Sequence, residues 1–138
     1  MMNAELRVKM EPRTKYPKKD LPERTMEFGI RVISLADSLP RRKSATVIGK
    51  QLLRSATSVG ANYHAACRGR SRTDFIAKLA IAIEEADESL YWLKMLRKSG
   101  LVPESKLYSL IDEANQLVSI LTVSSKTAKG NKHAILNS

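Results

Sequence analysis

The sequence is poor in several residue types, and each shortage excludes a class of protein. The chain has 138 residues and a single cysteine, Cys67, which excludes a disulfide within the chain and indicates a reducing compartment. We expect this cysteine to be a small buried residue rather than a reactive thiol. Aromatic residues make up only 5% of the chain, which leaves few side chains to stack on the bases of single-stranded nucleic acid.

Long hydrophobic runs are also missing. No apolar stretch reaches the roughly 18 residues typical of a membrane-spanning helix, and the N-terminal segment lacks the apolar run of a signal peptide. We therefore expect a soluble, cytoplasmic protein that has no membrane partner. The length fits one domain, and a hydrophobic content of 43% is enough to form a core.

Residues for catalysis or metal binding are scarce as well. His64 falls on a basic helix face and His133 in a loose tail, so the two histidines form neither a catalytic triad nor a metal pair. The Arg-x4–6-His motif of small helical ribonucleases fails before both histidines. Glu84 and Glu88 lack the Glu-x-x-His pattern of a bundle metal site. We expect a protein that is not an enzyme and that uses no cofactor or metal.

Acidic residues are missing from the middle of the chain. No acid occurs between Asp37 and Asp74, although the net charge of the whole chain is already +10. A local excess of positive charge indicates an anionic partner or an acidic protein surface. The basic residues of this acid-free stretch are Arg41, Arg42, Lys43, Lys50, Arg54, Arg68, Arg70 and Arg72.

Apolar residues recur with helical spacing in four segments, and no strand pattern occurs. The pattern predicts an all-α fold, an antiparallel up-down four-helix bundle over residues 21–123. We expect residues 1–20 to form a flexible basic arm and residues 124–138 to form a disordered basic tail. The four predicted core stripes are Leu21, Phe28, Val32, Leu35 and Leu39; Ile48, Leu52, Val59, Tyr63 and Ala66; Phe75, Ile76, Leu79, Ile83, Ala86, Leu90, Leu93 and Leu96; and Leu107, Leu110, Ala114, Leu117 and Leu121.

Capping residues set the predicted ends of these helices. Asp20 is the expected cap of the first helix and Ser44 that of the second. Ser71 and Asp74 form a capping box at the start of the third helix. Gly100 is a candidate for the left-handed residue that ends the third helix.

The second helix, within residues 48–72, has faces of different character. Small residues (Gly49, Ala56, Gly60 and Cys67) follow one edge of its core stripe, which would let another backbone approach closely. A ladder of Gln51, Ser55, Ser58 and Asn62 follows the other edge, where we expect satisfied polar groups at a helix interface.

The side of this helix opposite its core is basic, because Lys50, Arg54, His64 and Arg68 share it. With the basic turn before the helix, this face predicts a surface for the backbone of RNA or DNA, recognised without base specificity. The predicted nucleic-acid-binding residues are Arg41, Arg42, Lys43, Lys50, Arg54 and Arg68.

The outer face of the third helix predicts a protein contact, since large apolar residues are interleaved with acids there. The predicted subunit-interface residues are Ile81, Glu85, Glu88, Trp92 and Met95. Two interpretations of the basic face stay open. It binds nucleic acid, or Arg54 and Arg68 pair with Glu85 and Glu88 across a subunit boundary. In the second case the chain is a pure protein-interaction module.

The segments QLLRSATSVGANYHAACRGRSRTDFIAKL and EEADESLYWL resemble the four-helix-bundle proteins encoded in intervening sequences of bacterial 23S ribosomal RNA genes. The resemblance covers about residues 21–123. The matching residues are Gln51, Arg54, Ser55, Ser58 and Asn62 in the second helix, Arg72 before Phe75, and the acidic cluster Glu84, Glu85 and Glu88.

This resemblance implies a homopentamer of bundles around a central channel, with little known activity for most members. The family is related to the accessory variability determinant of diversity-generating retroelements, which binds nucleic acid and a reverse transcriptase through a basic surface. By the resemblance, the candidate partners of this chain are further copies of itself, an RNA or DNA backbone, and a reverse-transcriptase-like protein.

Overall fold

Four α-helices make up the described part of the chain. The computed structural model describes residues 21–137, with side chains as far as residue 130, so the predicted arm of residues 1–20 and its cap Asp20 lie outside the described residues. The helices are α2 (Leu21–Asp37), α3 (Lys43–Cys67), α4 (Arg72–Lys98) and α5 (Glu104–Asn137), and no strand occurs in this range. The predicted all-α fold is confirmed.

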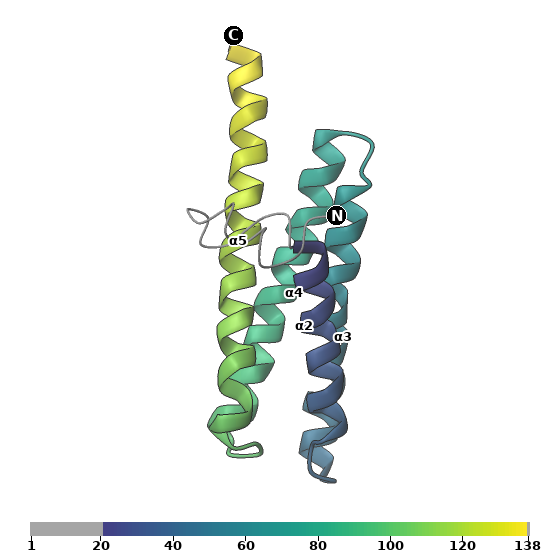
Figure 1. Ribbon diagram of the computed structural model, residues 1–138, viewed down its shortest axis with the longest axis vertical. Helices are drawn as coiled ribbons and strands as arrows, with labels where there is room; N and C mark the ends of the chain where they lie inside the picture. Colours follow the sequence, from purple (N-terminus) through teal and green to yellow (C-terminus); the bar gives the residue numbers. More distant parts are fainter. Residues whose placement is uncertain (1–20, 138) are drawn as a thin grey trace, which may run out of the picture.

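Each helix packs beside the next one, and α5 returns to contact α2 (Figure 1). Because short turns connect them, successive helices run in opposite directions, as in an up-down bundle. The contact between α2 and α5 includes a bidentate ion pair. Arg24 donates from Nε and Nη2 to the carboxylate of Glu113, at 3.1 and 2.6 Å.

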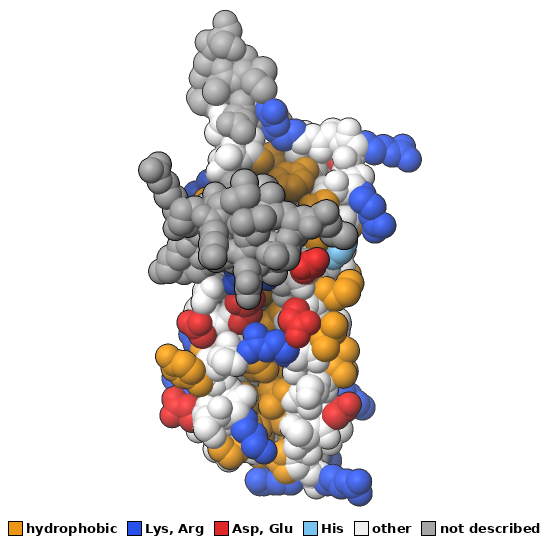
Figure 2. Space-filling view, in the orientation of Figure 1, with side chains coloured by type: hydrophobic (Ala, Val, Ile, Leu, Met, Phe, Trp, Pro, Cys, Tyr) orange, Lys and Arg blue, Asp and Glu red, His pale blue; other side chains and the backbone are white. Residues whose placement is uncertain are grey.

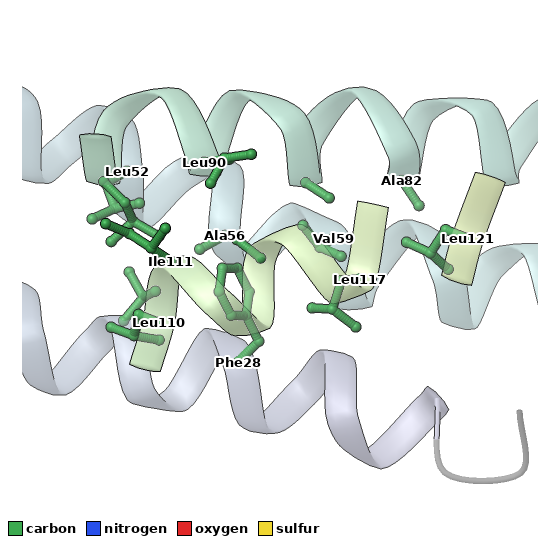
Figure 3. Close-up of a cluster of buried hydrophobic side chains, with 14 of the residues drawn as sticks. Phe28, Leu52, Ala56, Val59, Ala82, Leu90, Leu110, Ile111, Leu117 and Leu121 are labelled. Atoms are coloured by element: carbon green, nitrogen blue, oxygen red, sulfur yellow. The ribbon is translucent and has the colours of Figure 1, made fainter. Parts of the chain in front are cut away.

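All four helices contribute to one hydrophobic core (Figure 3). Phe28 of α2 lies among Ala56 and Val59 of α3 and Leu117 of α5, and each of these side chains is fully buried. The predicted stripe of the fourth helix is buried along its whole length, from Leu107 to Leu121. Helical periodicity therefore identified the inner faces, because burial of an apolar stripe is what stabilises an amphipathic helix.

Two of the predicted helix ends are confirmed and one is wrong. The Ser71 hydroxyl accepts a hydrogen bond from the backbone N–H of Asp74 at 3.1 Å, and Gly100 has φ +74°. Ser44, however, does not cap α3. The helix begins two residues earlier than a Ser44 cap would place it, at Lys43, with Arg42 in extended conformation and no side-chain cap. Arg42 N–H donates to the carbonyl of Pro40 at 2.8 Å, and this tight turn sets where the helix starts.

Helix α5 continues past Val123, where the sequence pattern predicted that it would end. It is helical to Asn137, so the predicted tail of residues 124–138 is mostly an extension of this helix. Ser124 and Ser125 are buried, which shows that packing goes on beyond the apolar seam. With 34 residues, α5 is longer than its antiparallel neighbour α4, which has 27.

Helices α2 and α3 approach each other closely through small residues. A Cβ atom on Gly60 would lie 3.3 Å from the backbone carbonyl of Thr25, so a side chain there would press on the α2 backbone. Gly49, Ala56 and Gly60 are all buried, as the small edge of the second helix predicted. Their cost in helix propensity is thus offset by the close contact that they permit.

Cys67 is exposed, contrary to our expectation. The reason is the shorter length of α2, which begins level with His64. The His64 Nε2 atom lies 3.2 Å from the carbonyl oxygen of Pro22, in the first turn of α2. Cys67 comes nearly one turn later along α3, where α2 no longer covers that edge of the helix.

Candidate nucleic-acid and self-association surfaces

Four of the predicted cations gather at one end of the bundle. Arg41, Arg42 and Lys43 are exposed in the turn between α2 and α3, and Lys50 is exposed two turns into α3. Arg41 and Lys50 line the same shallow hollow of about 270 Å³, beside Asp37. None of these four cations forms an ion pair with another residue between 21 and 130.

The bundle topology adds further cations to this end, which the sequence analysis missed. The turn between α4 and α5 lies at the same end as the turn between α2 and α3 (Figure 1). Lys98 and Lys106 flank that turn and are exposed, and Arg97 is half-buried. The space-filling view shows Lys and Arg side chains at this lower end (Figure 2). The available signal was the predicted up-down order, because it places the first and third turns at the same end of the bundle.

Arg54 does not belong to this group, because two carboxylates of the same chain form ion pairs with it. Its guanidinium donates to Glu85 at 3.0 Å and also to Glu88, both in α4. Partial desolvation acts to lower the pKa of Arg54, but the charges and hydrogen bonds of the two carboxylates outweigh it and raise the pKa above the usual value. The pairing of Arg54 that we considered across a subunit boundary occurs within one chain.

Arg68 lies at the opposite end of α3, about 27 Å from Lys50 along the helix axis. It is exposed and forms no ion pair with residues 21–130. The six predicted nucleic-acid-binding residues therefore do not form one stripe. Four lie together at one end, Arg54 is paired in the middle, and Arg68 stands apart.

The outer face of α4 carries the predicted subunit-interface residues in different states of exposure. Ile81 is exposed, whereas Trp92 and Met95 are half-buried and Trp92 packs against the core. The Trp92 Nε1 atom donates to Glu88 at 3.2 Å. Tyr91, which the sequence analysis missed, is exposed and packs edge-on against Trp92 with 5.0 Å between the ring centroids.

A second apolar surface lies between α2 and α3, and the sequence analysis did not predict it. Met26, Ile30 and Ile33 are exposed by 56%, 51% and 44%. They form one wall of a groove of about 490 Å³ whose other wall includes Ala61 and Arg68. Hydrophobic side chains are visible on this face beside a histidine (Figure 2). The spacing of the three residues, i, i+4 and i+7, was the available signal.

Residues 18–123 match the family model described as "23S rRNA-intervening sequence protein", which covers more than half of the chain. The chain belongs to this family.

One solved relative of this 23S rRNA-intervening sequence protein supports the assignment. It is a crystal structure, at 1.70 Å resolution, of a protein with unknown function from the S23 ribosomal protein family of Bacteroides thetaiotaomicron. The two chains are 34% identical and superimpose with a TM-score of 0.72, over 77% of this chain and 98% of the other. No curated protein matches this chain.

The polar residues that carry the family resemblance are bonded mainly within their own helix. Ser55 is buried, donates to the carbonyl of Leu52, and is joined to Ser89 of α4 by a 3.0 Å hydrogen bond. Asn62 donates to the carbonyl of Ser58 at 2.8 Å. Among the described side chains, no buried nitrogen or oxygen lacks a hydrogen-bond partner. In this member of the 23S rRNA-intervening sequence family, Ser55 is the ladder residue bonded to α4, while Ser58 and Asn62 bond within α3 and Gln51 is exposed.

Three further features of this family member concern metal binding, one perturbed pKa and membrane spanning. Within the described residues, no group of three His, Cys, Asp or Glu side chains is placed to hold a metal ion. Burial raises the pKa of Tyr63, and a hydrogen bond with the Cys67 thiol raises it further. None of the helices in the described range is both long and apolar enough to span a bilayer.

Proposed function

We propose that this chain is a cytoplasmic, self-associating four-helix bundle that binds the phosphate backbone of RNA or DNA without reading base sequence. The observation that carries the proposal is the basic end of the bundle, where Arg41, Arg42, Lys43 and Lys50 are exposed and form no ion pair with residues 21–130. Cations in this state can replace the counterions of nucleic acid, which is the main source of sequence-independent affinity.

The start of α3 strengthens this surface. Arg42 and Lys43 stand at the helix N-terminus, where no side chain caps the first turn. The positive end of the helix dipole therefore adds to the charge of the two side chains, and such helix ends favour phosphate groups. The few aromatic side chains of the chain fit contacts with the backbone rather than with stacked bases.

A titration of labelled RNA, single-stranded DNA and double-stranded DNA between about 50 and 200 mM salt would test the proposal. The double variant R42E/K43E should bind at least about tenfold more weakly at low salt, with a shallower salt dependence. R70E/R72E is the matched control, because it reverses two exposed arginines at the start of α4 and changes the net charge equally. It should bind within about threefold of the wild type.

Two results would contradict the basic end as the binding surface. Equal losses in R42E/K43E and R70E/R72E would show that only net charge matters. An affinity that does not change with salt would show that phosphate contacts do not dominate.

We further propose that the assembly is a homopentamer, as the family resemblance implies, and that it catalyses no reaction. Light scattering coupled to size exclusion should give five times the 15.4 kDa of one chain. RNA incubated with the protein and Mg²⁺ or Mn²⁺ should stay intact. Cleavage that disappears on adding a chelator would contradict the non-enzymatic part of this proposal.

The second candidate function is a protein-interaction module that binds no nucleic acid. The pairing of Arg54 with Glu85 and Glu88 favours it, because part of the basic face is already neutralised within the chain. A reverse-transcriptase-like protein is one partner of this kind that the resemblance implies. Absence of RNA and DNA binding at low salt, together with binding to such a protein, would favour this function over the first.

A further inference from the structure

The groove between α2 and α3 is an apolar surface with a defined floor, and neither α4 nor α5 contributes a residue to its lining. Met26, Ile30 and Ile33 form its α2 wall and are each about half exposed. Its floor is low because Gly29 and Gly60 carry no side chains and the two helices touch there. Exposed apolar residues of this size on one face, rimmed by polar groups, are typical of a protein contact site.

The charge of the groove comes from α3. Arg68 is the charged side chain among its lining residues, and α3 has no acidic residue at all. A partner that fits should therefore present apolar residues together with carboxylates. The segment of residues 1–20 fits poorly, since it carries more basic residues than acids.

The outer face of α4 presents apolar residues together with a carboxylate, as such a partner should. Ala77, Ile81, Glu84, Tyr91 and Met95 all lie on it, in register with a repeat of four and three residues. Ile81 and Tyr91 are exposed by 42% and 54%. Glu84 is exposed and forms no ion pair with residues 21–130.

We propose that the α2–α3 groove of one copy receives the outer face of α4 from a second copy of this chain. The apolar residues of α4 cover Met26, Ile30 and Ile33, and the Glu84 carboxylate lies toward Arg68. The repeat of four and three residues on both α2 and α4 suits helix packing at a shallow angle.

This pairing has a consequence for the form of the assembly. Because the groove and the α4 face are different surfaces, the contact is head-to-tail, and a pair of copies still offers one free groove and one free α4 face. Repeated contacts of this kind form a ring where the rotation between copies closes, and the homopentamer proposed above is such a ring. The inference thus rests on the self-association in the proposed function and adds which two surfaces meet.

The test uses one variant on each surface of the full-length protein. Ile30→Lys places a charge in the groove, and Ile81→Lys places one on the α4 face. Val47→Lys is the matched control, because Val47 is a similarly exposed aliphatic residue of α3 outside both surfaces. Circular dichroism should show that all three variants fold, since each changed side chain is exposed.

Light scattering should show that wild type and Val47→Lys assemble, while Ile30→Lys and Ile81→Lys each fall to the 15.4 kDa of a single chain. An equimolar mixture of the two monomeric variants should form a dimer. In that dimer the intact groove of Ile81→Lys holds the intact α4 face of Ile30→Lys, and no further copy can add.

Each contrary result has a separate meaning. If Ile30→Lys still assembles, or if the mixture stays monomeric, this pairing of surfaces is wrong while self-association by another route stands. If the wild type is monomeric at tens of micromolar, self-association itself is wrong. Binding of RNA by the basic end is measured separately, so neither result decides it.

Discussion

The two sides of α3 hold their neighbouring helices in different ways. On the side toward α2, contact depends on the absence of side chains, since Gly60 lets the backbone of Thr25 come close. On the side toward α4, polar groups join the two helices in addition to the shared core, through the Ser55–Ser89 hydrogen bond and the ion pairs of Arg54. The α2 side of α3 therefore has no room for a larger side chain at Gly60. On the α4 side, particular side chains of α3 have defined hydrogen-bond and ion-pair partners.

This difference decides which charges of α3 are available to a partner molecule. Arg54 points toward the α4 side and is neutralised by two carboxylates of its own chain. Lys50, one turn earlier, forms no ion pair with residues 21–130. Of these two cations on the same face of one helix, Arg54 is paired with the acids of α4 and Lys50 is not.

The largest effect on stability is expected from Gly60→Leu on the α2 side. A Cβ there already lies 3.3 Å from the Thr25 backbone, so a leucine must push α2 away and should destabilise the fold by about 3 kcal/mol. Urea denaturation measures this loss. Gly130→Leu is the matched control, because nothing lies within 4 Å of that position. A loss at position 60 no greater than at position 130 would contradict the close contact.

A medium effect is expected from Ser89→Ala on the α4 side. Removing this buried hydroxyl deletes its hydrogen bonds to Ser55 and to the carbonyl of Glu85, which should cost about 1 kcal/mol in urea denaturation. The double variant Ser55→Ala/Ser89→Ala should lose less than the sum of the single losses, because the shared bond is counted twice in that sum. Strict additivity would mean that the two serines do not interact.

The smallest effect is expected from Arg54→Met. Because Glu85 and Glu88 already neutralise Arg54, RNA affinity should stay within about twofold of the wild type, in contrast to the loss in R42E/K43E. The urea midpoint should fall less than in Ser89→Ala, since half of the Arg54 side chain is exposed. A loss of RNA affinity as large as that of R42E/K43E would place Arg54 in the binding surface.

Much of the fold could be predicted from local patterns. The apolar stripes of the first and fourth helices were right residue by residue around Phe28 and Leu117, because a helix repeats its buried face every three or four residues. Ser71 and Gly100 marked helix ends because their roles depend only on nearby backbone. The end of α5 could not be predicted in this way, because the sequence after Val123 carries no regular apolar repeat.

Less of the candidate site could be predicted. The sequence identified Arg41, Arg42 and Lys43 as an exposed basic turn, since a turn after Pro40 has little to bury it. It did not identify Lys98 and Lys106 as cations of the same end, although the predicted up-down order places the first and third turns at one end of the bundle. It also missed the groove, since its floor arises from two glycines on different helices.

By itself, the sequence determined the number of helices, their inner faces and the excess of positive charge, because these properties depend on residue type and on spacing along one helix. The tertiary structure alone decided that Arg54 is paired, that Cys67 is exposed and that Met26, Ile30 and Ile33 line a groove. Each of these facts depends on which residues of a second helix lie opposite the first. Helical periodicity cannot report this, because it shows which face of a helix turns inward and not what lies across from it.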